Sequence, residues 1–207
     1  MNDGSLIERG GLAFVFVAGA FASFRFISSL PAFSNDAPAK ERNHFLQAAC
    51  DGYIGHLVQA LQKGQDLECS DKNGSNALML AAWAGRRETV LMLLHNGANI
   101  HALSKRGWTA LTYAARAGES STVQILLEWG AKVDIVEDTT GATPLMFAAY
   151  VGSLPCVELL LEYGADTLIK TKQGAMAFAF AEENGHEGIA GLLRHRAAET
   201  QVSQSLN

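Results

Sequence analysis

Apolar and polar positions along this chain repeat with a fixed period. Short apolar segments carrying an alanine pair alternate with longer ones carrying a leucine pair, and a glycine stands between the two. Apolar residues spaced three or four positions apart predict amphipathic helices. Because one glycine recurs every 33 residues, with a single step of 34, we predict stacked units of a short helix, a turn, a longer helix and an extended loop. That glycine is Gly52, Gly85, Gly118, Gly152 and Gly185.

The residues inside each unit indicate how the helices pack. Small residues on the first helix let neighbouring helices approach closely, and the leucines supply a buried stripe on the second. The alanine pairs are Ala81-Ala82, Ala114-Ala115 and Ala148-Ala149, and the leucine pairs are Leu93-Leu94, Leu126-Leu127 and Leu160-Leu161. Pro155 falls near the start of its helix, where the missing N–H is tolerated.

Two stretches resemble the consensus of the ankyrin-repeat family. They are Ala142-Thr143-Pro144-Leu145 and Glu162-Tyr163-Gly164-Ala165-Asp166, and the resemblance extends from about Asn43 to the C-terminus. It implies an all-α ankyrin-repeat solenoid of about five helix-turn-helix repeats with β-hairpin-like loops. The threonine of the consensus turn survives only at Thr109 and Thr143.

The resemblance also implies the domain organisation. We expect a repeat domain over residues 40–198 and a polar C-terminal tail over residues 199–207. Because terminal repeats face water on one side, their departure from the consensus is expected. The expected repeats cover residues 43–74, 75–107, 108–141, 142–174 and 175–198.

The first 39 residues differ from the repeats, and their role is left open between three interpretations. Gly11–Phe24 is an apolar run, too short for a bilayer span of about 20 residues, and Arg25 ends it. The small residues Ala37-Pro38-Ala39 would suit cleavage of an export signal, which predicts a periplasmic or secreted protein. The opening residues are not clearly basic, so an uncleaved membrane anchor over residues 11–33, or a cytoplasmic tail, is the alternative.

Composition argues for a folded protein and against nucleic-acid binding. The chain is 48% hydrophobic and 18% charged, with a formal net charge of −5, and it holds no run of five basic residues. Three cysteines do not indicate a disulfide scaffold. The sequence leaves open whether Cys50 and Cys69 pair.

Candidate chemistry is weak throughout the chain. His44, Cys50 and His56 lie close in sequence, but without the spacing of a metal motif. Neither a nucleophile elbow nor a phosphate-binding loop occurs. We expect Glu137-Asp138 and Glu182-Glu183 to lie on solvated faces. We therefore predict a non-enzymatic protein without cofactor or metal, and keep a metal- or thiol-dependent enzyme built on the first repeat as the alternative.

In the architecture that the resemblance implies, the first helices and the loop tips line a concave face. Trp, Tyr and Arg dominate measured interface energies, and several fall on this face. We predict a monomeric adaptor whose groove is basic in the middle and acidic at its ends, near Asp51 and Glu183, and binds a protein with an acidic or mixed segment, and no nucleic acid or small molecule. One or two of the rings could instead pack against the next repeat. The candidate partner-binding residues are Lys72, Asn73, Trp83, Lys105, Arg106, Trp108, Arg116, Tyr150 and Lys172.

Overall fold

The computed structural model describes residues 39–205. The expected export signal or anchor over residues 1–39 therefore falls, apart from Ala39, outside the described residues. Among the helices that are described, none combines the length and apolar composition needed to cross a membrane.

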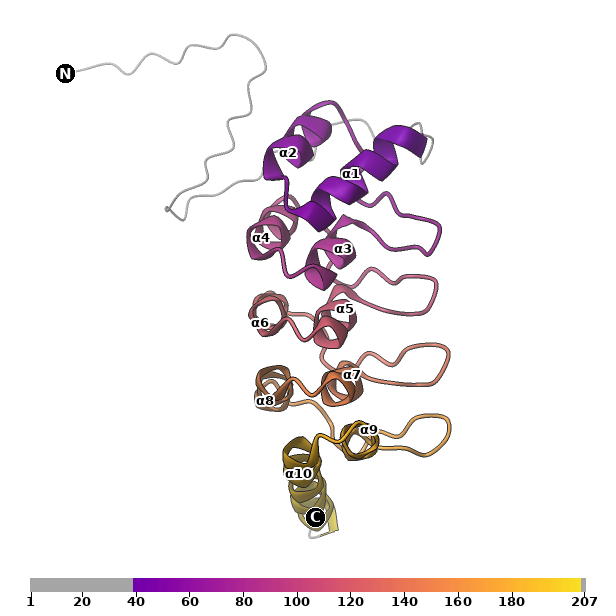
Figure 1. Cartoon of the computed structure of the whole chain (residues 1–207), viewed down its shortest axis with the longest axis vertical. Helices are drawn as coiled ribbons and strands as arrows, with labels where there is room; N and C mark the ends of the chain where they lie inside the picture. Colours follow the sequence, from indigo (N-terminus) through magenta and orange to yellow (C-terminus); the bar gives the residue numbers. More distant parts are fainter. Residues whose placement is uncertain (1–38, 206–207) are drawn as a thin grey trace, which may run out of the picture.

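The described residues form helices arranged in two columns (Figure 1). The odd-numbered helices stack on one another, the even-numbered helices form the second column, and the loops project beyond the odd-numbered column. The helices are α1 (Ala39–Asp51), α2 (Ile54–Gln62), α3 (Ala77–Trp83), α4 (Arg87–His95), α5 (Ala110–Ala117), α6 (Ser120–Glu128), α7 (Pro144–Val151), α8 (Leu154–Glu162), α9 (Ala177–Glu183) and α10 (Glu187–Ser205).

The predicted all-α class and the five helix pairs are confirmed. The loops before α3, α5, α7 and α9 each turn back on themselves, as the backbone hydrogen bond from Asp71 N–H to the Ser75 carbonyl shows in the first of them. In residues 39–205 the strand pairing is limited to an isolated antiparallel bridge between Ser70 and Asn76. The loops are thus hairpin-like without forming a sheet.

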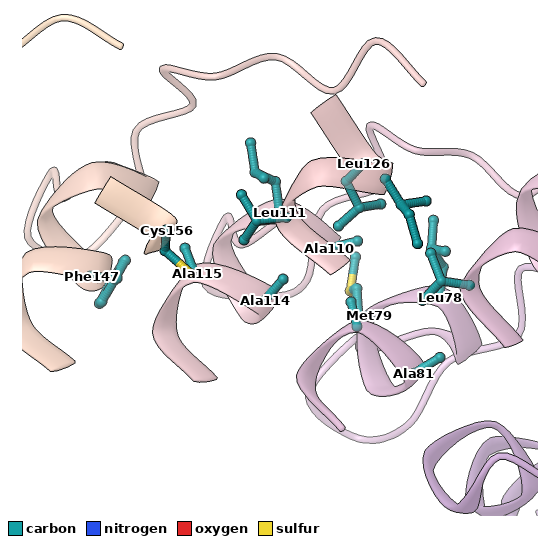
Figure 2. Packing of buried hydrophobic residues seen from close by; sticks show 14 of the residues in the cluster. Leu78, Met79, Ala81, Ala110, Leu111, Ala114, Ala115, Leu126, Phe147 and Cys156 are labelled. Atoms are coloured by element: carbon teal, nitrogen blue, oxygen red, sulfur yellow. The ribbon is translucent and has the colours of Figure 1, made fainter. Parts of the chain in front are cut away.

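The alanine and leucine pairs form the core of the stack. Both alanines of every pair are fully buried, and Leu93, Leu126 and Leu160 are fully buried as well. Figure 2 shows buried side chains of successive repeats, among them Leu78 and Ala110, pointing into one continuous cluster. Because each helix pair is apolar on both of its stacking sides, it depends on its neighbours for burial.

Three of the short helices, α3, α5 and α7, begin at side-chain caps. Thr109 Oγ1 accepts the Thr112 N–H at 3.3 Å, and Thr143 Oγ1 accepts the Met146 N–H at 3.4 Å. Asn76 caps α3 in the same way, its side-chain oxygen accepting the Met79 N–H at 3.0 Å. Counting only the two consensus threonines therefore missed one capped helix, because asparagine is an equally good N-cap.

The glycine between α7 and α8 is required by its own backbone conformation and by a side chain of the following repeat. Gly152 ends α7 with a φ of 75°, a left-handed conformation that favours glycine. A Cβ placed there would clash with the His186 ring. His186 therefore has a structural role in the contact between the fourth and fifth repeats.

The C-terminal end departs from the other repeats. At 19 residues, α10 is the longest helix described, and it continues to Ser205 through most of the expected polar tail. The cap position of α9 is Met176, whose side chain makes no capping hydrogen bond. Gly188 and Gly191 lie exposed within α10 with nothing near their absent side chains.

Candidate functional site

The inner face, formed by α3, α5, α7 and the loops before them, carries side chains in two rows. One row holds Trp83, Arg116 and Tyr150, at equivalent positions near the helix ends. The other row stands three residues earlier, and its members Tyr113 and Phe147 lie one helical turn away on the same side of α5 and α7. Residues three or four apart share a helix face, so the two rows form one surface.

The rings on this face contact each other across repeat boundaries. The Trp83 and Tyr113 centroids lie 6.3 Å apart and nearly perpendicular. The Trp108 ring lies 5.3 Å from Tyr113 and 5.1 Å from Phe147. These separations and tilts are the ones that aromatic pairs prefer. We call the surface of Trp83, Trp108, Tyr113, Phe147 and Tyr150 the aromatic floor.

Arg116 lies at the centre of the aromatic floor. Its guanidinium carbon is 5.5 Å from the Trp108 centroid, 5.6 Å from that of Phe147 and 5.7 Å from that of Tyr150. Arg106 lies 5.5 Å from the Trp108 centroid as well. A cation over an aromatic face within about 6 Å is attracted to the ring, so the rings fix the position of the charge.

Neither arginine is neutralised by a carboxylate in the part of the chain that the structure describes. The ion pairs found there join Arg194 to Glu182, and His195 and Arg196 to Glu199. All of these belong to the last repeat. Arg116 is therefore a half-buried cation held by rings, without an acidic partner among residues 39–205.

Trp108 and Arg116 are the two predicted partner-binding residues that are half-buried. The Trp108 side chain packs against the core cluster as well as against Tyr113 and Phe147. Its indole nitrogen Nε1 is buried and donates to no acceptor within the described residues. Trp108 is therefore a ring that packs against the next repeat, which was the alternative to partner binding. Trp83 and Tyr150 are each 43% exposed.

The loop tips border the aromatic floor at fixed spacing. Lys105 N–H donates to the Asn73 carbonyl at 2.9 Å, Asp138 N–H to the Arg106 carbonyl at 3.1 Å, and Lys172 N–H to the Thr140 carbonyl at 2.8 Å. These bonds join each loop to the next. The exposed predicted residues Lys72, Asn73, Lys105, Arg106 and Lys172 all lie on these tips.

Glu137 corrects one prediction from the sequence. Its side chain is buried, and its carboxylate accepts hydrogen bonds from the Thr139 N–H at 2.9 Å and from both the N–H and the hydroxyl of Thr140. Burial by itself would raise the pKa of Glu137, but the hydrogen bonds from Thr140 and Thr139 outweigh it and lower the pKa to about 2. The expected solvated face is found at Asp138, which is exposed.

The first repeat holds ring contacts and thiols without a metal-binding geometry. The His44 and His56 rings lie 5.8 Å apart, edge to face. Among residues 39–205 no three His, Cys, Asp or Glu side chains come together as a metal site would require. Cys50 and Cys69 are free thiols, and burial, with a smaller contribution from Asp66, raises the pKa of Cys69 to about 11. A thiol with such a pKa is a poor nucleophile.

Sequence reasoning did not include Tyr113 and Phe147 among the candidate residues. A signal for both was present, because each stands three positions before a predicted residue on the same helix, Tyr113 before Arg116 and Phe147 before Tyr150. The repeat period shows that the two positions are equivalent. It does not show that their rings reach Trp108.

Two protein-family models match the chain. One is described as ankyrin repeats (3 copies) and matches residues 45–137, and the other is described as ankyrin repeats (many copies) and matches residues 126–181. No curated protein matches the sequence.

Proposed function

Because the chain belongs to the ankyrin-repeat family, whose repeats are generally protein-binding modules, we propose that it is a non-enzymatic adaptor that binds a protein partner on its inner face. The observation that carries this proposal is the aromatic floor. Trp83 and Tyr150 are each 43% exposed on either side of Arg116. Contiguous exposed aromatics mark interaction surfaces, and Trp, Tyr and Arg are the residue types that dominate interface energies.

The arrangement of these side chains supports a preorganised site. Tyr113 is held by Ser75 through a 2.8 Å contact between their hydroxyls, and the loop tips are held by backbone hydrogen bonds between repeats. A surface that is already ordered loses less conformational entropy on binding. Side chains in such a surface can therefore contribute more of their contact energy to affinity.

The experiment that tests this proposal compares two exposed tryptophans. Partners captured by the full chain are quantified by mass spectrometry for the wild type, Trp83→Ala and Trp129→Ala. Trp129 is 41% exposed, on the even-numbered column at the end of α6, and serves as the matched control. An anchor at Trp83 should contribute at least about 2 kcal/mol to binding. Equal loss with both variants, or no loss with Trp83→Ala, would rule out the inner face.

Trp108→Ala is a less informative variant than Trp83→Ala. Because the Trp108 side chain packs against the core cluster, its removal is expected to lower stability as well as binding. Trp83 contacts the Tyr113 ring and is 43% exposed. Loss of binding at Trp83 can therefore be assigned to the surface once a thermal melt shows an unchanged fold.

We also propose that the protein is exported. The support is the sequence pattern of an apolar run followed by the small residues Ala37-Pro38-Ala39. Peptide mass mapping of the purified protein from the soluble fraction tests this, and an N-terminus at Lys40 is the expected result. Recovery of an intact peptide from residues 1–39 in soluble protein would contradict cleavage, and a requirement for detergent would favour the membrane anchor.

A further inference from the structure

We propose that the partner segment bound by the inner face is an extended peptide with an internal Asp or Glu that pairs with Arg116, flanked on both sides by apolar or aromatic residues that pack on the aromatic floor. This inference rests on the proposed function and specifies the chemistry of the partner.

The need for a carboxylate follows from the environment of Arg116. Three rings hold its guanidinium, and no carboxylate within the described part of the chain pairs with it. A guanidinium presents a planar set of donors that matches a carboxylate through two parallel hydrogen bonds. Because the side chain is already half-buried and fixed, little ordering is needed to form that pair.

A second observation concerns the Trp108 ring, which two arginines contact. Trp108 Nε1 is buried and makes no hydrogen bond within residues 39–205, and both Arg106 and Arg116 lie over this ring. A buried donor without an acceptor is unfavourable. That donor is buried, so the part of this site that a partner meets is the positive charge of the two arginines, which favours an acidic segment over an apolar one.

The position of Arg116 within the floor argues for an internal acidic residue. Trp83 on α3 lies on one side of it, and Phe147 and Tyr150 on α7 lie on the other. A segment that ended in a C-terminal carboxylate at Arg116 would cover one side only. A chain that continues through covers both, and its apolar flanking side chains would bury the exposed parts of Trp83 and Tyr150.

Charge along the inner face restricts the acidic part of the segment to its centre. Lys105, Arg106 and Arg116 make the middle basic, whereas Asp51 at the end of α1 and Glu183 at the end of α9 make the two ends acidic. Like charges facing each other across an interface are unfavourable. The expected partner segment therefore has an acidic centre and neutral or basic ends. The protein that binds it has a formal net charge of −5.

The test uses synthetic peptides and the full chain. Fluorescent 12-residue peptides, acetylated and amidated, carry Asp or Glu, Asn or Gln, or Lys at the two central positions, with Phe, Leu, Trp and Ser varied in the flanks. Binding is measured by anisotropy to the wild type, to Arg116→Gln, Arg116→Lys and Arg116→Glu, to Trp83→Ala, and to Arg87→Gln. Arg87 is exposed on α4 in the other column, and is the control.

We expect the wild type to select peptides with acidic centres. Arg116→Gln should weaken their binding about 30-fold, as for an interface arginine of this kind, and Arg116→Lys should weaken it less. Arg87→Gln should leave it unchanged. Arg116→Glu should bind the peptides with a central Lys instead, a reversal that loss of folding cannot produce.

Other outcomes overturn the inference in distinguishable ways. Peptides that bind equally with acidic and amide centres, depend on Trp83 and ignore Arg116→Gln would leave the proposed function standing and remove the acidic partner. Two further probes are measured alongside, the same peptides with a free C-terminal carboxylate and an oligothymidine, and binding confined to either of them would also remove the internal acidic residue. If no peptide depends on either Trp83 or Arg116, both the inference and the proposed function fail.

Discussion

The hydroxyl oxygens of Ser75 and Tyr113 lie 2.8 Å apart, although the two residues are 38 positions apart in the sequence. Ser75 belongs to the loop before α3, and Tyr113 lies within α5 of the next repeat. This bond joins the loop of one repeat to the inner helix of the next. It also fixes the Tyr113 ring between Trp83 and Trp108.

Removal of that hydroxyl should lower stability. Tyr113→Phe leaves Ser75, which is 2% exposed, with an unpaired hydroxyl, and an uncompensated buried group costs about 1–3 kcal/mol. Urea denaturation followed by circular dichroism measures the change. Tyr163→Phe is the control, because Tyr163 is 42% exposed and its loss should change stability by less than about 0.5 kcal/mol. Equal effects of the two substitutions would contradict the assigned contact.

Stability should depend on pH through Glu137. Its pKa lies at about 2 in the folded protein, against an ordinary value of 4.5. A lowered pKa means that the carboxylate stabilises the fold above the ordinary value and that this contribution is lost as pH falls through the folded value. Thermal melts of the wild type and of Glu137→Gln should therefore differ at pH 7 and converge between about pH 4.5 and 2.

A surface glutamate provides the comparison for that titration. Glu158 is exposed on α8, so Glu158→Gln should follow the wild type at every pH. If Glu137→Gln also follows the wild type at every pH, the hydrogen bonds of Glu137 do not stabilise the loop.

The three thiols should react at different rates. Cys156 is fully buried and burial raises its pKa, as it does for Cys69, whereas Cys50 is half-buried on α1. A thiol reagent in native buffer should modify one thiol, and all three after denaturation. Cys50→Ser should abolish the native reaction. Reagent uptake that rises only after reduction would instead reveal a Cys50–Cys69 disulfide.

Alanine substitution should change stability in opposite directions at glycines within helices and at glycines in turns. Nothing lies near the absent side chains of Gly188 and Gly191, so Gly188→Ala and Gly191→Ala should each stabilise α10 by up to about 1 kcal/mol. Gly74 has a φ of 77°, and a Cβ there would lie 2.9 Å from the Lys105 nitrogen, so Gly74→Ala should destabilise. Chemical denaturation of the three variants measures the signs.

Hydrogen exchange shows where the helix glycines matter. With an uncapped α9 and two glycines in α10, the last repeat should exchange first, and the Gly188→Ala and Gly191→Ala substitutions should slow that exchange. Uniform protection across the five repeats would contradict a weak C-terminal end.

The sequence by itself determined the architecture. Each repeat contacts only its neighbours, so one local pattern applied five times specifies the whole stack. The burial of the alanine pairs and of Leu93, Leu126 and Leu160 followed from helical spacing alone. The position of Pro155 at the start of α8 followed in the same way.

Tertiary structure decided which side chains meet across repeats. The ring centroids of Trp108 and Phe147 are 5.1 Å apart. This distance depends on the rotation and rise between two helix pairs, which cannot be calculated from helical periodicity. Tertiary structure also decided the different environments of Glu137 and Asp138. The curvature of the loop turns the Glu137 carboxylate inward onto Thr140 and leaves that of Asp138 in solvent. The period thus placed residues on the inner face, and only the packing of neighbouring repeats brought Arg116 together with its three rings.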